Sequence, residues 1–293
     1  MPKRCRKKTI SGNQMNKVVK RLLMFFIGLP LILFLVSLSY LNHIAIQLII
    51  PVFAVIAGHE LYSMLEEKKK PLFRRSIVLI FTGILPYVSY FVILEELPQE
   101  VVFWAFIAEL LILFAYESIV TKVFTHSFEK IANSAFIILY CGFFITFISR
   151  ITTLENSTFM MVLYLIIVFM CDSGAWFFGV LFGRSTRGVC AASPNKSTVG
   201  FIGGILSAIA SSIVLKKMFP DVYTLSYLYL VVISLITSVS AIIGDLVESV
   251  IKRSLDSKDS GTVIPGRGGV LDSIDSLLVA APIFYIAVQF LFK

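Results

Sequence analysis

Long apolar runs separated by short polar stretches fill this sequence from residue 22 almost to its end. About nine of these runs approach the roughly 20 residues that a helix needs to cross a bilayer. They lie near residues 22–41, 44–64, 76–94, 101–119, 132–150, 158–182, 200–219, 224–245 and 271–291. Only Asn42 and His43 separate the first two runs, so we expect a tight turn there. The pattern predicts an all-α, polytopic integral membrane protein.

The amino-acid composition supports this fold class and excludes others. Of 293 residues, 57% are hydrophobic and 15% are charged, whereas about 25% of the residues in a soluble domain are charged. A soluble fold could not bury so much apolar surface, but a bilayer removes the need for a polar exterior. The four cysteines form no CxxC pair and the three histidines lack ligand spacing. We therefore expect neither a disulfide framework nor a transition-metal centre.

The basic residues are placed as in a membrane protein and do not indicate a nucleic-acid partner. Much of the net charge of +8 lies in residues 1–21, directly before the first apolar run. We interpret this segment as a cytoplasmic anchor beside anionic lipid, since the run that follows is too long for a cleaved signal peptide. The remaining chain divides into N-terminal transmembrane helices (22–150) and a C-terminal catalytic region with cytoplasmic loops (151–293).

The loops between the predicted spans indicate an orientation. With a cytoplasmic N-terminus, four loops on the same side hold most of the lysines and arginines, at residues 66–75, 121–130, 183–198 and 246–270. Lys216 and Lys217 are the main exceptions on the opposite side. The positive-inside rule therefore places both C-terminal polar loops in the cytoplasm, where nucleotides and magnesium are available. The compact length favours a bacterial plasma membrane, with an internal eukaryotic membrane as the alternative.

Acidic side chains in apolar runs are costly unless they face a polar cavity or pair with a cation. In the second half, Asp172 lies within the sixth predicted span, Asp245 and Glu248 lie where the eighth ends, and Asp272 and Asp275 lie where the ninth begins. Each of these acids is therefore a functional candidate. For Asp172 alone, a functional role and a structural ion pair are equally favoured.

The first five spans also contain ionisable residues, namely His59, Glu60, Glu109 and Glu117. No glycine-rich or basic loop stands beside them in the sequence. We therefore predict interfacial or structural roles for them, although the depth of Glu109 leaves a functional role open.

The spacing of the C-terminal acids indicates a magnesium site. Asp272 and Asp275 are three residues apart, so a helix places both carboxylates on one face. Two neighbouring carboxylates repel each other unless a cation lies between them. Mg²⁺ prefers oxygen ligands and often binds a few carboxylates together with substrate phosphates. Asp245, at the end of the preceding span, could complete the site from a second helix.

Two basic, glycine-containing loops are predicted on the same side as these acids. One runs from Lys252 to Gly269, and the other from Gly183 to Thr198. Glycines let backbone N–H groups approach phosphate oxygens, and the helix that starts near Val270 points its positive end at the same place. Lysines and arginines add charge-assisted contacts. Together with the acids, these loops favour phosphoryl or nucleotidyl transfer over a merely solvated basic surface.

The C-terminal sequence resembles the phosphatidate cytidylyltransferase (CDP-diacylglycerol synthase) family. The resemblance rests on Ser249-Val250-Ile251-Lys252-Arg253, Lys258-Asp259-Ser260-Gly261 and Ile264-Pro265-Gly266-Arg267-Gly268-Gly269-Val270-Leu271-Asp272-Ser273-Ile274-Asp275. A middle segment, with Asp172, Gly179, Gly183-Arg184 and Ser193-Pro194-Asn195-Lys196-Ser197, is similar as well. The similarity covers roughly residues 170–280. The pattern is specific because its fixed positions are glycines or polar residues that random membrane helices lack.

Three positions depart from the family pattern. The family usually has His where this chain has Arg267, Arg where it has Ser273, and an acidic residue where Val199 precedes Gly200. Arg267 can bind phosphate but cannot accept a proton near neutral pH. The three acids of the predicted magnesium site are intact, so we expect an active but divergent member.

The resemblance implies transfer of the cytidylyl group from CTP to phosphatidic acid, giving CDP-diacylglycerol and pyrophosphate for phospholipid synthesis. It implies Mg²⁺, with a second cation such as K⁺, and membrane lipids as partners; a homodimer is a further expectation. The catalytic set is Asp245, Asp272, Asp275 and Lys252, and the first three are the expected metal ligands. The substrate-binding set is Asp172, Arg184, Ser193, Lys196, Ser249, Arg253, Lys258, Arg267, Gly268 and Gly269.

Other functions remain open at this stage. A CTP-dependent polyprenol or other lipid kinase would transfer the γ-phosphate and release CDP. A transporter would also explain acids inside membrane helices, but it should show paired repeats between its halves. A catalytically inactive scaffold is disfavoured by the intact acids.

Overall fold

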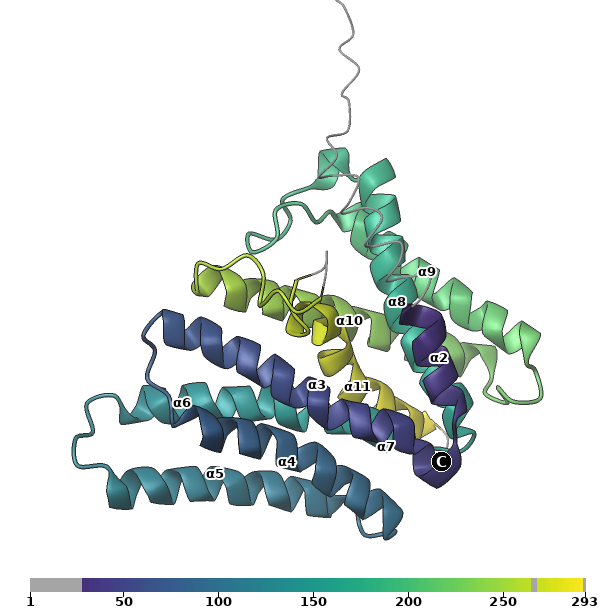
Figure 1. Cartoon of the computed structure of the whole chain (residues 1–293). Helices are drawn as coiled ribbons and strands as arrows, with labels where there is room; N and C mark the ends of the chain where they lie inside the picture. The colour runs from purple at the N-terminus through teal and green to yellow at the C-terminus, as the bar shows by residue number, and fades with distance from the viewer. Residues whose placement is uncertain (1–27, 265–267, 292–293) are drawn as a thin grey trace, which may run out of the picture.

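The computed structural model describes residues 28–264 and 268–291, and their regular structure is helical, with isolated β-bridges but no strand (Figure 1). The predicted all-α fold is confirmed. The elements are α2 (Leu29–Ser37), α3 (Tyr40–Glu67), α4 (Arg75–Leu94), α5 (Glu100–Val120), α6 (Ser127–Ile137), the π-helix η2 (Ile138–Phe143), α7 (Thr146–Ile151), α8 (Ser157–Leu181), the 3₁₀-helix η3 (Arg184–Thr186), α9 (Thr198–Met218), α10 (Tyr227–Ser254) and α11 (Leu271–Leu291).

Eight candidate membrane spans occur in the described part of the chain, and they correspond to the second to ninth predicted runs. The first predicted run is described only from Gly28 onward, where α2 has nine residues. The basic segment 1–21 lies outside the described residues. The turn predicted at Asn42 and His43 is confirmed, since both residues have a left-handed backbone, with φ of 52° and 62°.

Two predicted spans differ from the structure. The fifth is not one α-helix, because α6 passes through η2 into α7, and Gly142 in η2 packs against the backbone of Thr82 on α4. The eighth does not end at residue 245, because α10 continues to Ser254. Glu248 and Lys252 form an ion pair four residues apart in this extension, which supports the helix. The predicted loop at 246–270 therefore starts only after Ser254.

Helix α11 joins the two hydrophobic cores of the molecule. Its first half, including Leu271 and Leu278, packs in a core built mainly from α3 to α6. Its second half, including Phe284, packs in a core built mainly from α7 to α10. Figure 1 shows α11 between α3 and α10, and it contacts both helices. The start of α11 is thus held by elements from both halves of the sequence.

Helices α8 and α9 approach each other closely through glycines. A Cβ atom on Gly204 would lie 2.6 Å from the carbonyl oxygen of Cys171, and one on Gly203 would lie 2.5 Å from the Phe178 side chain. Small residues of this kind allow membrane helices to pack backbone against backbone. This contact sets the position of the loop between the two helices, which carries Lys196.

We expect Gly204→Ala to destabilise the protein by about 1–3 kcal/mol, because the new methyl group meets backbone that cannot move independently. The measurement is the thermal unfolding midpoint of the protein purified in detergent. Gly28→Ala is the matched control, since no atom of the residues that the structure describes meets its Cβ position within 4 Å. Equal midpoints for the two variants would contradict the packing argument.

Candidate active site

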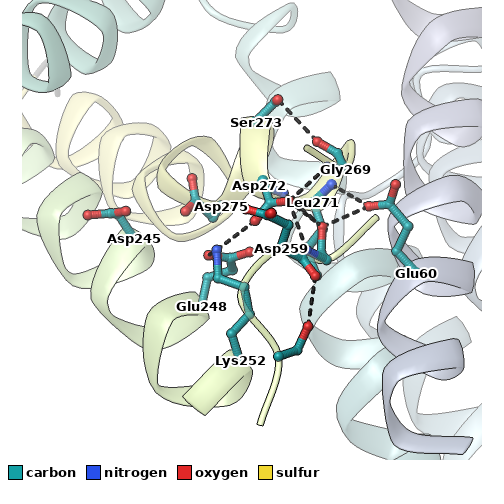
Figure 2. A network of polar contacts seen from close by, with 12 residues as sticks. Glu60, Asp245, Glu248, Lys252, Asp259, Gly269, Leu271, Asp272, Ser273 and Asp275 are labelled. Atoms are coloured by element: carbon teal, nitrogen blue, oxygen red, sulfur yellow. Dashed lines mark hydrogen bonds and ion pairs between the residues drawn. The ribbon is translucent and has the colours of Figure 1, made fainter. Parts of the chain in front are cut away.

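Acidic and basic side chains gather where α10 ends and α11 begins (Figure 2). Asp245, Glu248 and Lys252 are three and four residues apart, so they share one face of α10. Asp272 and Asp275 project from the first turns of α11. The two helices pack against each other along their length, and this contact brings the predicted acids of both into one region.

Lys252 neutralises the most buried part of this cluster. Its Nζ lies 2.6 Å from Oδ1 of Asp272 and also forms an ion pair with Glu248. The side chains of Glu248 and Asp272 are only 1% and 6% exposed. One oxygen of Glu248, Oε1, is buried without a hydrogen-bond partner in this structure. One lysine ammonium thus neutralises the charge of two carboxylates only in part, and Lys252, Glu248 and Asp272 together keep a net negative charge.

Asp272 anchors the glycine-containing loop to α11. Its Oδ2 accepts hydrogen bonds from the N–H of Gly269 at 2.7 Å, and from the N–H and Oγ of Ser260 at 2.8 and 2.9 Å. The loop is also closed by two backbone hydrogen bonds between Ile264 and Gly268, of 2.8 and 3.1 Å. Gly268 has φ of +115°, a conformation that other residues rarely adopt. Arg267 lies outside the described residues.

The loop before α9 reaches the same cluster through Lys196. The Lys196 ammonium forms an ion pair with Asp245. Burial lowers the pKa of Lys196, and the nearby carboxylates of Asp275 and Asp172 oppose that shift. Asp172, on α8, also interacts with Ser276 of α11, whose Oγ lies 3.5 Å from its carboxylate. Three segments that are distant in the sequence therefore meet around Lys196.

The other predicted substrate-binding residues lie on the two basic loops and on α10, and they are less buried than Glu248. Arg253 is exposed at the end of α10, and its Nε donates to the carbonyl oxygen of Ala192 at 3.3 Å, which links the two basic loops. Arg184 and Lys258 are exposed, whereas Ser193 and Ser249 are half-buried. Arg184, Arg253 and Lys258 are thus open to solvent.

The backbone N–H groups at the start of α11 are not open to a phosphate in this structure, contrary to the expectation from the glycine pattern. The N–H of Gly269 donates to Asp272. Those of Val270 and Leu271 donate to Glu60, on α3, at 2.9 and 2.8 Å. A carboxylate satisfies the positive end of the helix just as a phosphate would. The protein itself supplies the anion at this position.

Sequence reasoning underrated Glu60 because no polar loop stands beside it in the chain. In the fold the glycine loop, 200 residues away, lies against it. The available signal was a carboxylate inside an apolar run, which needs a partner.

The carboxylates fit a hard cation by their donor chemistry, since Mg²⁺ prefers oxygen ligands. The unpartnered Oε1 of Glu248 is also consistent with a missing positive charge. Among the described residues, however, no three His, Cys, Asp or Glu side chains are grouped closely enough to hold a metal ion. Asp272 already uses both oxygens, whereas Asp245 and Asp275 face Lys196.

A sequence model of the cytidylyltransferase family matches residues 19–291, which is nearly the whole chain. The chain belongs to this family. It is therefore a membrane nucleotidyltransferase.

Curated relatives of this cytidylyltransferase-family protein are bacterial phosphatidate cytidylyltransferases. The protein from Thermotoga maritima is 30% identical over 259 residues, which cover 87% of this chain and 92% of that protein. The protein from Bacillus subtilis is 36% identical over 178 residues, covering 60% of this chain and 64% of that protein. One from Staphylococcus epidermidis is 34% identical over 199 residues, covering 66% and 75%.

We expect Lys252→Met to destabilise the protein by about 3–5 kcal/mol, because it leaves two buried carboxylates without their cation. The measurement is the unfolding midpoint in detergent at neutral pH. Lys122→Met, at an exposed loop position, is the control and should stay within about 0.5 kcal/mol of the parent protein. Equal stability of both variants would show that Lys252 does not compensate the acids.

Proposed function

We propose that this protein transfers the cytidylyl group of CTP to phosphatidic acid, with formation of CDP-diacylglycerol and release of pyrophosphate. The observation that carries the proposal is the match to the cytidylyltransferase family over residues 19–291. The relatives named phosphatidate cytidylyltransferase support the choice of lipid substrate. Eight described helices that are long and apolar enough to cross a membrane support a substrate held in the bilayer.

In this proposal the cations orient two anionic substrates. A phosphate oxygen of phosphatidic acid attacks the α-phosphorus of CTP in line, and pyrophosphate leaves. The attacking oxygen is already anionic, so no strong general base is needed and Arg267 in place of His is compatible with activity. Catalysis then depends on positioning and on neutralisation of charge. Lys196, Lys252, Arg253 and Lys258 are the residues that we assign to the phosphates.

We assign Asp245 and Asp275 as the principal ligands of Mg²⁺, joined by Asp272 when its present hydrogen bonds open. The bound cation would neutralise the triphosphate and polarise its α-phosphoryl group. Lys196 would then exchange its contact with Asp245 for a contact with substrate phosphate. A second cation such as K⁺ and a homodimer stay predictions.

We place the site at the cytoplasmic face of a bacterial plasma membrane. The bias of lysine and arginine toward four loops supports this orientation, and the curated relatives are bacterial. CTP would arrive from the cytosol while the lipid enters from the side. In this arrangement Asp272 and Asp275, at the start of α11, lie toward the cytoplasmic end of their helix.

With CTP labelled on both the base and the γ-phosphate, we expect only the base label to enter the lipid fraction. Asp275→Asn should lower this transfer by at least about 100-fold, because it removes a carboxylate that we assign to hold the Mg²⁺ that neutralises the triphosphate. The assay uses purified protein in mixed micelles of lipid and detergent, with phosphatidic acid and Mg²⁺.

Asp221→Asn, at an exposed position, is the control and should leave the rate unchanged. Omission of Mg²⁺ with added EDTA should abolish transfer. Transfer of the γ-phosphate label to an added prenol would favour the lipid-kinase alternative. No transfer of either label to any lipid would contradict the proposed reaction.

The orientation can be tested with the natural cysteine at position 190, which lies in the loop before α9, while Cys141 and Cys171 are buried. In a Cys5→Ser background, a membrane-impermeant maleimide should modify Cys190 only after the cells are permeabilised. A Glu155→Cys variant, placed in the turn before α8 on the other side, should react in intact cells. Modification of Cys190 in intact cells would reverse the proposed orientation.

A further inference from the structure

A buried carboxylate on α3 holds the start of α11, although α3 lies far outside residues 170–280, where the sequence carries the resemblance. Glu60 is 5% exposed. Its Oε1 accepts the N–H of Val270 at 2.9 Å, and its Oε2 accepts the N–H of Leu271 at 2.8 Å. These two N–H groups belong to the first turn of a helix, whose donors have no partner within the helix. Glu60 thus caps α11 from another helix.

The glycine loop is shaped to fit this carboxylate. A Cβ atom on Gly269 would lie 2.4 Å from Oε2 of Glu60, and one on Gly261 would lie 2.6 Å from Oε1. Any larger residue at either position would displace the carboxylate. The lack of space beside Glu60 therefore explains why these two positions are glycines. No phosphate in the loop is needed to explain them.

Ser260 couples Glu60 to the catalytic cluster. Its Oγ lies 3.1 Å from Oε2 of Glu60 and 2.9 Å from Oδ2 of Asp272. The hydroxyl has one proton to share between these two carboxylates. Asp272 in turn contacts Lys252. A continuous set of polar contacts thus connects α3, the glycine loop, α11 and α10.

Among the described residues, Glu60 attaches α3 to this region more strongly than the ion pair that follows the end of α3. That ion pair joins Lys68 and Asp256 at 3.1 Å, and the Asp256 side chain is 84% exposed. Exposed ion pairs contribute little to structure, whereas hydrogen bonds to a buried carboxylate are among the strong ones. The position of the α11 start, and of Asp272 and Asp275 on it, therefore depends on Glu60.

We propose that Glu60 is a positioning residue for cytidylyl transfer, acting through its bonds to Ser260 and the first turn of α11. The role in transfer rests on the proposed function. The physical claim beneath it, that Glu60 holds the glycine loop and the start of α11, can be measured without any activity. Asp272 and Lys252 keep their positions relative to the substrates only while this carboxylate stays bound.

The test compares Glu60→Gln with Glu109→Gln. Glutamine keeps the size and one acceptor oxygen but turns an N–H₂ group toward a backbone donor. Glu109 is the matched control because it is also 5% exposed in a membrane helix, yet neither of its oxygens has a hydrogen-bond partner. Both variants replace a buried carboxyl group on a membrane helix with a carboxamide of nearly the same size.

Two readouts are taken on each purified variant. Hydrogen–deuterium exchange should become faster in peptides that cover residues 257–275 for Glu60→Gln, with little change elsewhere and none in this region for Glu109→Gln. The kcat/KM for transfer to phosphatidic acid should fall by about 100-fold for Glu60→Gln. Glu60→Asp, which keeps the charge but shortens the reach, should recover part of the rate.

The outcomes separate the two proposals. If the parent protein transfers no cytidylyl group, the proposed function fails, and the exchange data still decide whether Glu60 holds the loop. Wild-type exchange in residues 257–275 for Glu60→Gln would overturn the inference. Faster exchange over all helices, together with the loss of rate, would also overturn the inference. It would show that Glu60 only stabilises the protein as a whole.

Discussion

The arrangement of helices around the start of α11 depends on buried carboxylates that need hydrogen-bond donors or a cation beside them. Asp272 accepts three hydrogen bonds from the glycine loop and binds Lys252, and Glu60 accepts the first N–H groups of the helix. In an apolar environment an unpaired carboxylate is so costly that each acid must find a cation or donors nearby. This requirement draws α3, α10 and the loop to a single helix end.

The same constraint connects the two halves of the membrane domain. Helix α11 packs its first half against α3 to α6 and its second half against α7 to α10. A displacement of either helix bundle would therefore move α11 and, with it, the acids Asp272 and Asp275 at the start of this helix. The α3-to-α6 bundle, which lies outside the C-terminal motifs, thereby helps to hold the candidate site. This arrangement suits an enzyme whose chemistry relies on positioning more than on a reactive side chain.

Positive charge around the acids is supplied by lysines on separate elements. Lys252 belongs to α10 itself, whereas Lys196 comes from the loop that the close α8–α9 contact holds in place. These ammonium groups stabilise a cluster that has more acids than bases. In the proposed function these same ammonium groups bind the substrate phosphates, for which their ion pairs with the acids have to open.

The sequence alone determined the eight described spans, the family and the residues of the cluster, because apolar length and the polar motif are local properties of the chain. It also determined that Asp272 and Asp275 share a face. The sequence-based prediction placed the end of α10 too early. It also assigned a phosphate to the N–H groups at the start of α11, which instead donate hydrogen bonds to Glu60 and Asp272. Only the tertiary structure decided these partners, because Glu60 and the glycine loop are 200 residues apart and their contact depends on how the helices pack.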